Sequence, residues 1–550
     1  MGFPSRTVLA VSLAAGYLAS SGKLLPWVSL GFVSAFAAAW AVQFFAWAVW
    51  VVLVYPKFFS PLRHLPQPDG GSWLLGQFPK ISRMPMGAPA LEWINTIPNY
   101  GLIRYLGLFN QERLLIASPK ALAEVLVTKN YDFKKSDEFR HFLGRLLGIG
   151  LLLAEGDEHK KQRKSLMPAF AFRHIKELYP VFWDKARESV QVITDKILSG
   201  TATDQKGTGV IEVGSFASRV ALDIIGVAAL GRDFGALKDP SNELNQSYMT
   251  LFEPSREPRI LIALSMLIPL RLFTALPLKR NIEISNASRF VRSTCAALIS
   301  EKKQKLVGKE RVDIDILSVA LESGGFADEN LVDQLMTFLA AGHETTASSM
   351  TWAIYLLAKH TDVQARLRAE IRQNLPPITG NSAISSTEID SLPYLNAVCN
   401  EVLRYFSPVA STSRVTACDT SIQGQFVPKG TPIFLAPWAV NKSVAIWGSD
   451  AGEFNPERWM PKFDGDKRAA SGGATTNYAF LTFLHGPRSC IGQSFAKAEF
   501  ACLLAAWVGR FSFELHNEAD RDESKIDIKG GITSKPAHGM HVQTTLLDGW

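Results

Sequence analysis

A cysteine near the C-terminus stands in the residue pattern with the clearest chemical meaning, Phe483-Leu-His-Gly486-Pro-Arg488-Ser-Cys490-Ile-Gly492. Its fixed positions, Phe-x-x-Gly-x-Arg-x-Cys-x-Gly, would occur by chance in roughly one chain in ten thousand. Cys490 lies just before a predicted helix, whose N-terminal partial positive charge favours a thiolate, the form that binds metals. Gly486 and Gly492 allow tight turns and a close approach of backbone N–H groups to the sulfur. We favour this interpretation over a buried structural cysteine in a Gly-Pro loop.

A second polar group interrupts a long apolar helix pattern, at Ala341-Gly342-His343-Glu344-Thr345-Thr346. Glycine and threonine disfavour regular helix. A threonine hydroxyl that bonds a carbonyl of the preceding turn is expected to open the helix locally. Alone, this group reads equally well as a polar helix stripe. For His343 we expect a hydrogen bond in helix packing rather than a contact with substrate.

Together the two motifs resemble those of the cytochrome P450 family, over roughly residues 65–550. The resemblance implies a cytochrome P450 fold and haem b as cofactor, with Cys490 as the axial ligand of its iron. A thiolate on haem iron favours cleavage of the O–O bond. The resemblance also implies that Thr345 holds oxygen and a water, and that Glu344 relays protons to that water from solvent. The other cofactor-binding residues of the loop would be Phe483, Gly486, Arg488 and Gly492.

Three charged residues are expected to form a structural network. Glu401 and Arg404 lie three residues apart on a predicted helix, so their side chains share one face. A lone pair of this kind is usually a surface ion pair that contributes little. Here Arg458 follows, in Pro456-Glu-Arg458-Trp459. The resemblance implies that Glu401, Arg404 and Arg458 make a buried network that supports the cysteine loop and haem incorporation rather than turnover.

The resemblance also points to residues that contact the haem propionates. They are Arg488, Arg414, Arg163 and His159. His159 departs from the family, where many members have tryptophan, but a histidine can still donate a hydrogen bond to a carboxylate. The segment around it, from Glu155 to Phe170, is similar to microsomal members from filamentous fungi.

The elements that must position these motifs are mainly helical. We predict helices over residues 330–359, 394–406 and 495–508, and strands over 422–426 and 433–435, which flank the turn 428–430. Residues 200–209 and 463–477 are predicted surface loops. The fold class is therefore mainly α with small β-sheets, and residues 72–550 are predicted to form one haem-thiolate catalytic domain.

The N-terminus predicts a membrane anchor over residues 1–56. No charged residue occurs from Leu24 to Pro56, and a membrane span needs about 20 apolar residues. We predict one span within 24–56 and regard 7–22 as a candidate second span, although a cleaved signal peptide fits the shorter stretch as well. Residues 57–71, with three prolines, predict a stiff extended hinge. Basic residues flank the long run on both sides, which leaves its orientation open.

Composition narrows the class of protein further. The 550 residues are 47% hydrophobic and 20% charged, with a net charge of +7, which excludes a disordered chain. No Lys/Arg-rich block accompanies the basic excess, so we expect no nucleic-acid partner. The five cysteines are odd in number and include no CxxC pair, which argues against a disulfide framework or a zinc ribbon.

The predicted function is a membrane-bound monooxygenase that oxidises a lipophilic small molecule with O2 and electrons from NADPH-cytochrome P450 reductase. Fungal likeness associates the substrate with secondary metabolism, and the family suggests the endoplasmic reticulum with the catalytic domain facing the cytosol. The pocket should include Phe338, Ala341, Thr345 and residues 142–153 and 409–413. A basic patch for the reductase is expected at Lys160, Lys161, Lys164 and Lys497, although a merely solvated face fits equally well.

Two alternatives stay open. The first is a haem-thiolate isomerase, desaturase or coupling enzyme without net oxygen insertion. Relatives of the isomerase kind tend to lack the acid–threonine pair that is present here as Glu344-Thr345. The second is a non-catalytic haem-binding membrane sensor, in which a proton relay would have no purpose.

Overall fold

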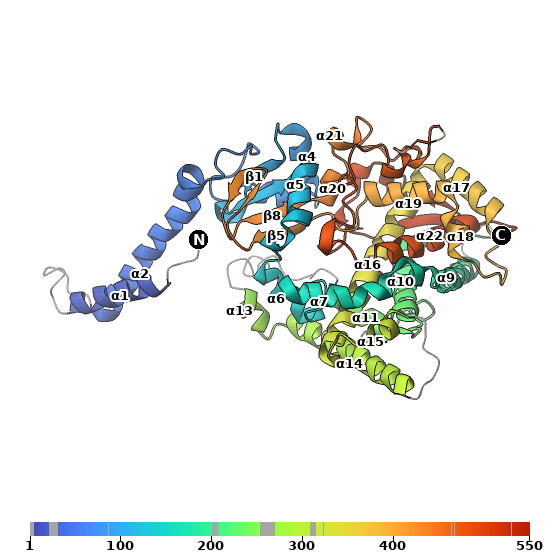
Figure 1. Cartoon of the computed structure of the whole chain (residues 1–550), viewed down its shortest axis with the longest axis horizontal. Helices are drawn as coiled ribbons and strands as arrows, with labels where there is room; N and C mark the ends of the chain where they lie inside the picture. The colour runs from blue at the N-terminus through green and yellow to red at the C-terminus, as the bar shows by residue number, and fades with distance from the viewer. Residues whose placement is uncertain are drawn as a thin grey trace.

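A long buried helix, α16 (Asp328–Lys359), runs through the body of the molecule (Figure 1). Its 32 residues extend about 48 Å. Asp328 and Glu329 in the first turn and Lys359 in the last complement the helix dipole. The helix predicted over 330–359 is thereby confirmed.

The computed structural model describes residues 5–20, 31–85, 87–200, 207–252, 270–307, 315–322, 324–463, 465–466, 468–529 and 531–550. The longer helices of the body, besides α16, are α6 (Asp137–Leu147), α7 (Gly156–Leu166), α9 (Tyr179–Ser199), α10 (Val213–Leu230), α11 (Glu243–Phe252), α14 (Lys279–Val307), α17 (Thr361–Asn374), α19 (Pro393–Tyr405) and α22 (Gln493–Arg510). The shorter ones are α3 (Phe78–Arg83), α4 (Ala88–Thr96), α5 (Pro119–Ala123), α8 (Phe172–Lys176), α13 (Leu270–Ala275), α15 (Ile316–Glu322), α18 (Ser386–Asp390), α20 (Pro437–Val440) and α21 (Val444–Trp447). Helices α19 and α22 confirm the other two predicted helices.

Four small sheets complete the body. The largest has the strand order β1 (Leu102–Leu106), β2 (Glu112–Ile116), β8 (Pro432–Leu435), β5 (Thr412–Thr416) and β3 (Phe133–Lys134). Only its β2–β8 pair is parallel. The others join β4 (Thr208–Glu212), β12 (His541–Leu546) and β9 (Phe511–Leu515), then β10 (Ile528–Lys529) with β11 (Lys535–Pro536), and β6 (Thr420–Ile422) with β7 (Gln425–Val427). The class is mainly α with small sheets, as predicted.

Two hydrophobic cores meet at the cysteine loop. One core joins the helices, and the other lies around the five-stranded sheet. Phe483 packs against the helical core and Leu484 against the sheet core, while Phe480 touches both. The loop therefore depends on both parts of the molecule for its shape.

Three local predictions are wrong. The strand predicted over 422–426 is a hairpin, because Gln423 and Gly424 take positive φ angles of 49° and 79° and turn the chain between β6 and β7. The loop predicted over 200–209 ends early, since β4 begins at Thr208, and residues 201–206 lie outside the described part of the chain. The hinge predicted over 57–71 begins as helix.

The N-terminal helices project from one end of the body (Figure 1). They are α1 (Ser5–Ser20) and α2 (Phe32–Val49), and α2 continues without a break into the π-helix η1 (Trp50–Phe59). By length and composition, Phe32–Phe59 could cross a membrane; so could α10, which is buried in the body. Residues 24–30 of the predicted span, and 21–22 of the candidate second span, lie outside the described residues.

Candidate functional site

The cysteine loop is a tight turn held against the sheet side of the body. The Cys490 N–H donates to the Phe483 carbonyl at 2.9 Å, and α22 begins three residues later. Gly486 has a φ of 75°, and a Cβ there would lie 2.1 Å from the carbonyl oxygen of Leu126, so only glycine fits. Gly492 has a φ of −89°, and a Cβ would meet only Phe170 at 3.6 Å. The predicted tight turn is thus made at Gly486, and the predicted close approach of a backbone N–H to the sulfur is made by Gly492.

The thiol of Cys490 is solvent-accessible although it lies inside the body. Burial raises its pKa, whereas the Gly492 N–H, which bonds the sulfur, and the guanidinium of Arg163 lower it. Arg163 is held in place by Ser489, to whose carbonyl and hydroxyl it donates at 2.7 and 3.3 Å. The sulfur thus has a donor and a cation beside it, and both favour the thiolate.

Basic side chains gather beside this loop around a single carboxylate. They are Lys135, His159, Arg163, Arg414 and Arg488, and the carboxylate is Glu155, which pairs with Arg488. We call these five the cationic cluster. Burial and the neighbouring arginine Arg488 lower the pKa of Arg414 to about 10. Burial and Arg414 lower the pKa of Lys135 to about 7. The cluster is short of negative charge.

The cationic cluster and the accessible thiol fit haem. The Nε and Nη1 atoms of Arg488 are buried without a hydrogen-bond partner among the described residues. Such donors, with Arg414 and Lys135 beside them, suit the two propionates, and Cys490 suits the iron. His159 lies in the cluster, and its Nδ1 shares a 3.3 Å hydrogen bond with the Tyr131 hydroxyl. Burial and Arg488 lower the pKa of His159 to about 4, so the imidazole is neutral.

Helix α16 stays regular where local opening was predicted. The Thr345 hydroxyl does donate to the Ala341 carbonyl, at 2.8 Å, but it does so without breaking the helix. Gly342 allows close packing instead, since a Cβ there would lie 2.8 Å from Ile225 of α10. His343 is fully buried and shares a 2.6 Å hydrogen bond with Ser218 of α10, which confirms its expected role in helix packing.

Glu344 is held by residues from the far end of the chain. Its Oε2 lies 2.5 Å from the Lys535 ammonium and accepts a hydrogen bond from Thr533 at 3.3 Å. Burial would raise the pKa of this carboxyl, but Lys535 outweighs it and holds the pKa below its usual value. Glu344 is therefore ionised and linked to Lys535, whose side chain is 34% exposed and so reaches solvent.

A cavity of about 390 Å³ opens along the Thr345 face of α16. Its lining includes three residues of α16, Ala341, Glu344 and Thr345, and three of the predicted pocket edge, Leu143, Leu147 and Leu152. It also includes Met249 and Phe252 of α11, Val409, Ile532 and Thr533 before β11, and Lys535 of β11. The prediction for Phe338 is wrong, because its ring packs edge-on against Phe170 at 5.4 Å. Of residues 409–413, Val409 lines the cavity.

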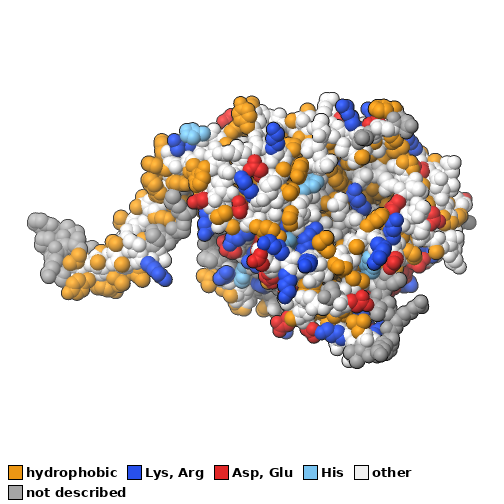
Figure 2. Space-filling model, in the orientation of Figure 1, with side chains coloured by type: hydrophobic (Ala, Val, Ile, Leu, Met, Phe, Trp, Pro, Cys, Tyr) orange, Lys and Arg blue, Asp and Glu red, His pale blue; other side chains and the backbone are white. Residues whose placement is uncertain are grey.

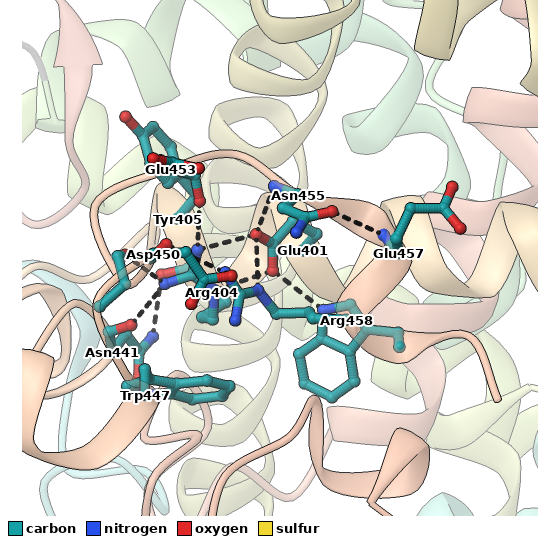
Figure 3. A network of polar contacts seen from close by, with 12 residues as sticks. Glu401, Arg404, Tyr405, Asn441, Trp447, Asp450, Glu453, Asn455, Glu457 and Arg458 are labelled. Carbon is teal, nitrogen blue, oxygen red and sulfur yellow. Dashed lines mark hydrogen bonds and ion pairs between the residues drawn. The ribbon is translucent and has the colours of Figure 1, made fainter. Parts of the chain in front are cut away.

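Glu401, Arg404 and Arg458 form the buried network that was predicted (Figure 3). Arg404 meets both oxygens of Glu401, at 2.7 and 2.8 Å, and Arg458 donates to Glu401 at 3.1 Å. The remaining Arg404 donors bond the carbonyls of Asn441, Ala451 and Glu453. We call this the Glu401 network.

Asn441 connects the Glu401 network to the cysteine loop. Its amide donates to the Thr482 hydroxyl at 2.8 Å, and its oxygen accepts from the Leu481 N–H at 2.8 Å. Thr482 donates in turn to the Leu403 carbonyl. The segment that leads into Phe483 is thus fixed to α19.

Three residues of the site escaped sequence reasoning. Lys135 and Lys535 carry no motif and lie far along the chain from the groups they meet. Glu499 of α22 is fully buried, accepts from Thr346 at 2.9 Å, and has a pKa raised by burial to about 8. Its place in α22, on the face toward α16, was the only available signal.

The predicted basic patch is only partly present. Lys160, Lys161 and Lys164 are exposed on α7. Lys497 turns inward, donates to the Asn400 side chain at 2.9 Å and lies over the Phe480 ring. Its inclusion in the patch is wrong, because its ammonium is engaged with Asn400 and the Phe480 ring and burial lowers the pKa of this amine.

Comparisons with known proteins agree with this site. The family model described as Cytochrome P450 matches residues 66–541. Cytochrome P450 monooxygenase sphH of Aspergillus fumigatus is 48% identical over 504 residues, 91% of each chain. Cytochrome P450 monooxygenase FUM15 of Gibberella moniliformis is 46% identical over 90% of each chain, and buaD of Petromyces alliaceus, of the same description, is 39% identical over 100% of this chain and 99% of its own.

Proposed function

The chain belongs to the cytochrome P450 family of monooxygenases, and from that premise we propose that it inserts one atom of O2 into a lipophilic small molecule of fungal secondary metabolism. The other oxygen atom leaves as water, with two electrons and two protons taken up. When bound through Cys490, haem supplies the activation of dioxygen.

The cavity beside Thr345 carries this proposal. Its lining combines large apolar side chains from α6, α11 and the segment before β11 with polar and charged groups such as Glu212 and Arg219, and its volume of about 390 Å³ suits a small molecule. Ala341 and Thr345 of α16 line the same cavity. An apolar substrate carbon can therefore lie beside the one hydroxyl that the proposed reaction uses.

The chain's own residues offer a proton path to that space. Lys535 reaches solvent, Glu344 pairs with it at 2.5 Å, and Thr345 follows Glu344 on the cavity face. The Thr345 hydroxyl donates to the Ala341 carbonyl, so its oxygen lone pairs are free to accept a hydrogen bond from a water in the cavity. We propose that protons enter by way of Lys535 and Glu344.

The remaining parts of the proposal concern partners and place. We propose NADPH-cytochrome P450 reductase as electron donor, steered by Lys160, Lys161 and Lys164. Lys160 already pairs with Asp157 at 2.8 Å, so Lys161 and Lys164 would contribute most. We further propose that the helix Phe32–Phe59 holds the protein in the endoplasmic reticulum membrane with the catalytic domain in the cytosol.

A mass comparison of metabolites, from the host with and without this gene, tests the reaction class. We expect the deletion to accumulate a precursor with one oxygen atom fewer than the lost product. Complementation with Cys490→Ala should not restore the product, because the thiolate is gone. An equal oxygen count in precursor and product would replace insertion by rearrangement, desaturation or coupling on the same cofactor.

The role of Thr345 is tested on the purified enzyme with its reductase. In Thr345→Ala we expect product formation to fall by about tenfold to a hundredfold while O2 consumption continues and yields hydrogen peroxide. Thr337→Ala is the matched control, since Thr337 makes the same bond one turn back, to Asp333 at 2.8 Å, and does not belong to the cavity lining. Tight coupling in Thr345→Ala would exclude the proposed role.

A further inference from the structure

We propose that α1 and α2 cross the membrane together as a helical hairpin, so that the N-terminus lies on the same, cytosolic side as the catalytic domain. The inference rests on the membrane anchoring proposed above and concerns its topology. A single span would instead place the N-terminus in the lumen.

The two helices are similar in length, and α2 matches the thickness of a bilayer while α1 is slightly shorter. Helix α1 has 16 residues and α2 has 18, which correspond to about 24 and 27 Å. The hydrocarbon layer of the endoplasmic reticulum is about 27 Å thick. The continuation η1 is not needed for crossing, because the body already binds it.

The body holds η1 through its backbone carbonyls. Arg104 donates to the Pro56 carbonyl at 2.6 Å, and Asn110 donates to the Val52 carbonyl at 3.0 Å. Both donors belong to the β1–β2 hairpin region, and both side chains are buried. The part of the long helix beyond these contacts is α2. The proposed membrane segment is therefore α2, and η1 forms a separate stalk that joins it to the body.

The interface between α1 and α2 is built as membrane helices pack. Val8, Ser12 and Gly16 form the buried stripe of α1. A Cβ at Gly16 would lie 3.0 Å from the Phe32 ring, so the two backbones approach closely there. Gly16 meets the start of α2 and Ser12 meets Gln43 near its end, which makes the pair antiparallel. Small residues at such interfaces are typical of helices in lipid.

The most polar side chain of the long run is satisfied inside this hairpin. Gln43 donates to the Ser12 hydroxyl at 3.0 Å and to the Ala39 carbonyl at 3.1 Å, and Ser12 is fully buried. In a lone α2 the Gln43 amide would keep the Ala39 carbonyl of its own helix but lose the Ser12 hydroxyl, and hydrocarbon offers no replacement for that partner, at a cost in free energy. Pairing with α1 removes this cost.

The outer surface of the hairpin suits lipid. Tyr17, Val33, Val42 and Phe45 are each about 70% exposed, between 67% and 77%. Figure 2 shows hydrophobic side chains along this projection, in contrast to the mixed surface of the body. The body supplies no partner for this surface among the described residues, and a bilayer covers all sides of a hairpin at once.

The basic residues decide the orientation once both helices cross. Arg6 lies in the first turn of α1, and Lys57 and Arg63 follow α2, whereas Lys23 alone lies between the helices in the sequence. For a single span these residues divide evenly between the two sides. For a hairpin three of them share one side, and the positive-inside rule places that side in the cytosol.

Glycosylation mapping of the full-length chain in endoplasmic reticulum membranes tests the topology. One variant carries an N-glycosylation acceptor in an extension before Met1, and the other carries it in a flexible insert between Ser20 and Gly31. We expect one glycan on the insert and none on the extension. The chain brings its own reporter for the catalytic domain, Asn286-Ala287-Ser288, where Asn286 is exposed on α14. Asn286→Gln should leave the mobility of the protein unchanged.

Any other pattern of glycosylation contradicts the proposed hairpin. A glycan on the extension alone means one crossing with a lumenal N-terminus. No glycan on either variant means that the hairpin does not cross, and loss of the extension means that α1 is removed as a signal peptide. The reduced, carbon-monoxide-bound spectrum of the same membranes reports the haem thiolate separately, so failure of the topology and failure of the proposed function are told apart.

Discussion

The Glu401 network and the cationic cluster both reach the cysteine loop, and they balance charge in opposite ways. In the Glu401 network each arginine meets a carboxylate, and the remaining Arg404 donors bond backbone carbonyls. In the cationic cluster Lys135, Arg414 and Arg488 share the single carboxylate of Glu155, and Arg488 keeps two donors without partners among the described residues. The first is complete within the protein, whereas the second is complete only with an anionic ligand. Removing one cation from the Glu401 network should therefore destabilise the fold, whereas removing one from the cationic cluster should weaken the binding of haem.

The largest effect is expected in the Glu401 network. Arg404→Met removes the buried cation that pairs with Glu401, which keeps only Arg458 as a charged donor, and it leaves three carbonyls without the donor Arg404. Breaking a buried pair in this way costs about 3–5 kcal/mol. Thermal unfolding and the yield of haem protein should both fall sharply. Arg366→Met is the control, since the Arg366–Glu457 pair is half exposed and should contribute less than about 1 kcal/mol. Equal losses in the two variants would contradict the structural role.

Removing a cation from the cationic cluster should leave the stability of the fold unchanged and weaken the binding of haem. Arg414→Met relieves repulsion from Arg488, but if Arg414 donates to a propionate it also removes a charged hydrogen bond of about 1.5–3 kcal/mol. We expect haem to leave the purified enzyme about 10- to 100-fold faster, with thermal stability of the loaded protein reduced only through haem loss. Transfer of haem to a scavenger apoprotein measures the rate. An unchanged rate would exclude Arg414 as a propionate contact.

Lys135 predicts a pH dependence of haem retention. Its pKa is lowered to about 7 by burial and by Arg414, and less by Arg488 and Arg140, while the Glu155 carboxylate raises it. Propionates nearby would raise that pKa, so haem binding takes up a proton at Lys135 above about pH 7. Haem loss should therefore become faster as pH rises from about 7, by at most about tenfold per pH unit. Lys135→Met should remove this dependence; a slope that persists in the variant would exclude Lys135 as its source.

The smallest effect is expected at His159. His159→Trp replaces one neutral donor by another and loses only the long 3.3 Å contact with Tyr131. A change of about threefold in the rate of haem loss corresponds to the 0.5–1 kcal/mol of such a bond. A loss as large as that of Arg414→Met would make His159 a principal contact of the cofactor.

The sequence could predict those parts of the site that lie together in the chain. The cysteine loop and the Glu344-Thr345 pair each occupy a few consecutive residues, and Glu401 and Arg404 share one helix face. Lys535 and Lys135 could not be predicted, because only the folded chain brings β11 to α16 and places the residue after β3 beside Arg414. The same holds for Lys497, whose direction depends on packing against Phe480, and not on its position in the helix.

The stalk η1 bears on how the enzyme would meet its electron donor. Because two buried side chains hold its carbonyls, the catalytic domain would keep one height and tilt above the bilayer rather than swing on a tether. A reductase in the same membrane then shares a thin layer with it, and their encounter rate depends on molecules per membrane area. Spreading both proteins over more lipid should slow electron delivery, whereas diluting the same vesicles with buffer should leave it unchanged.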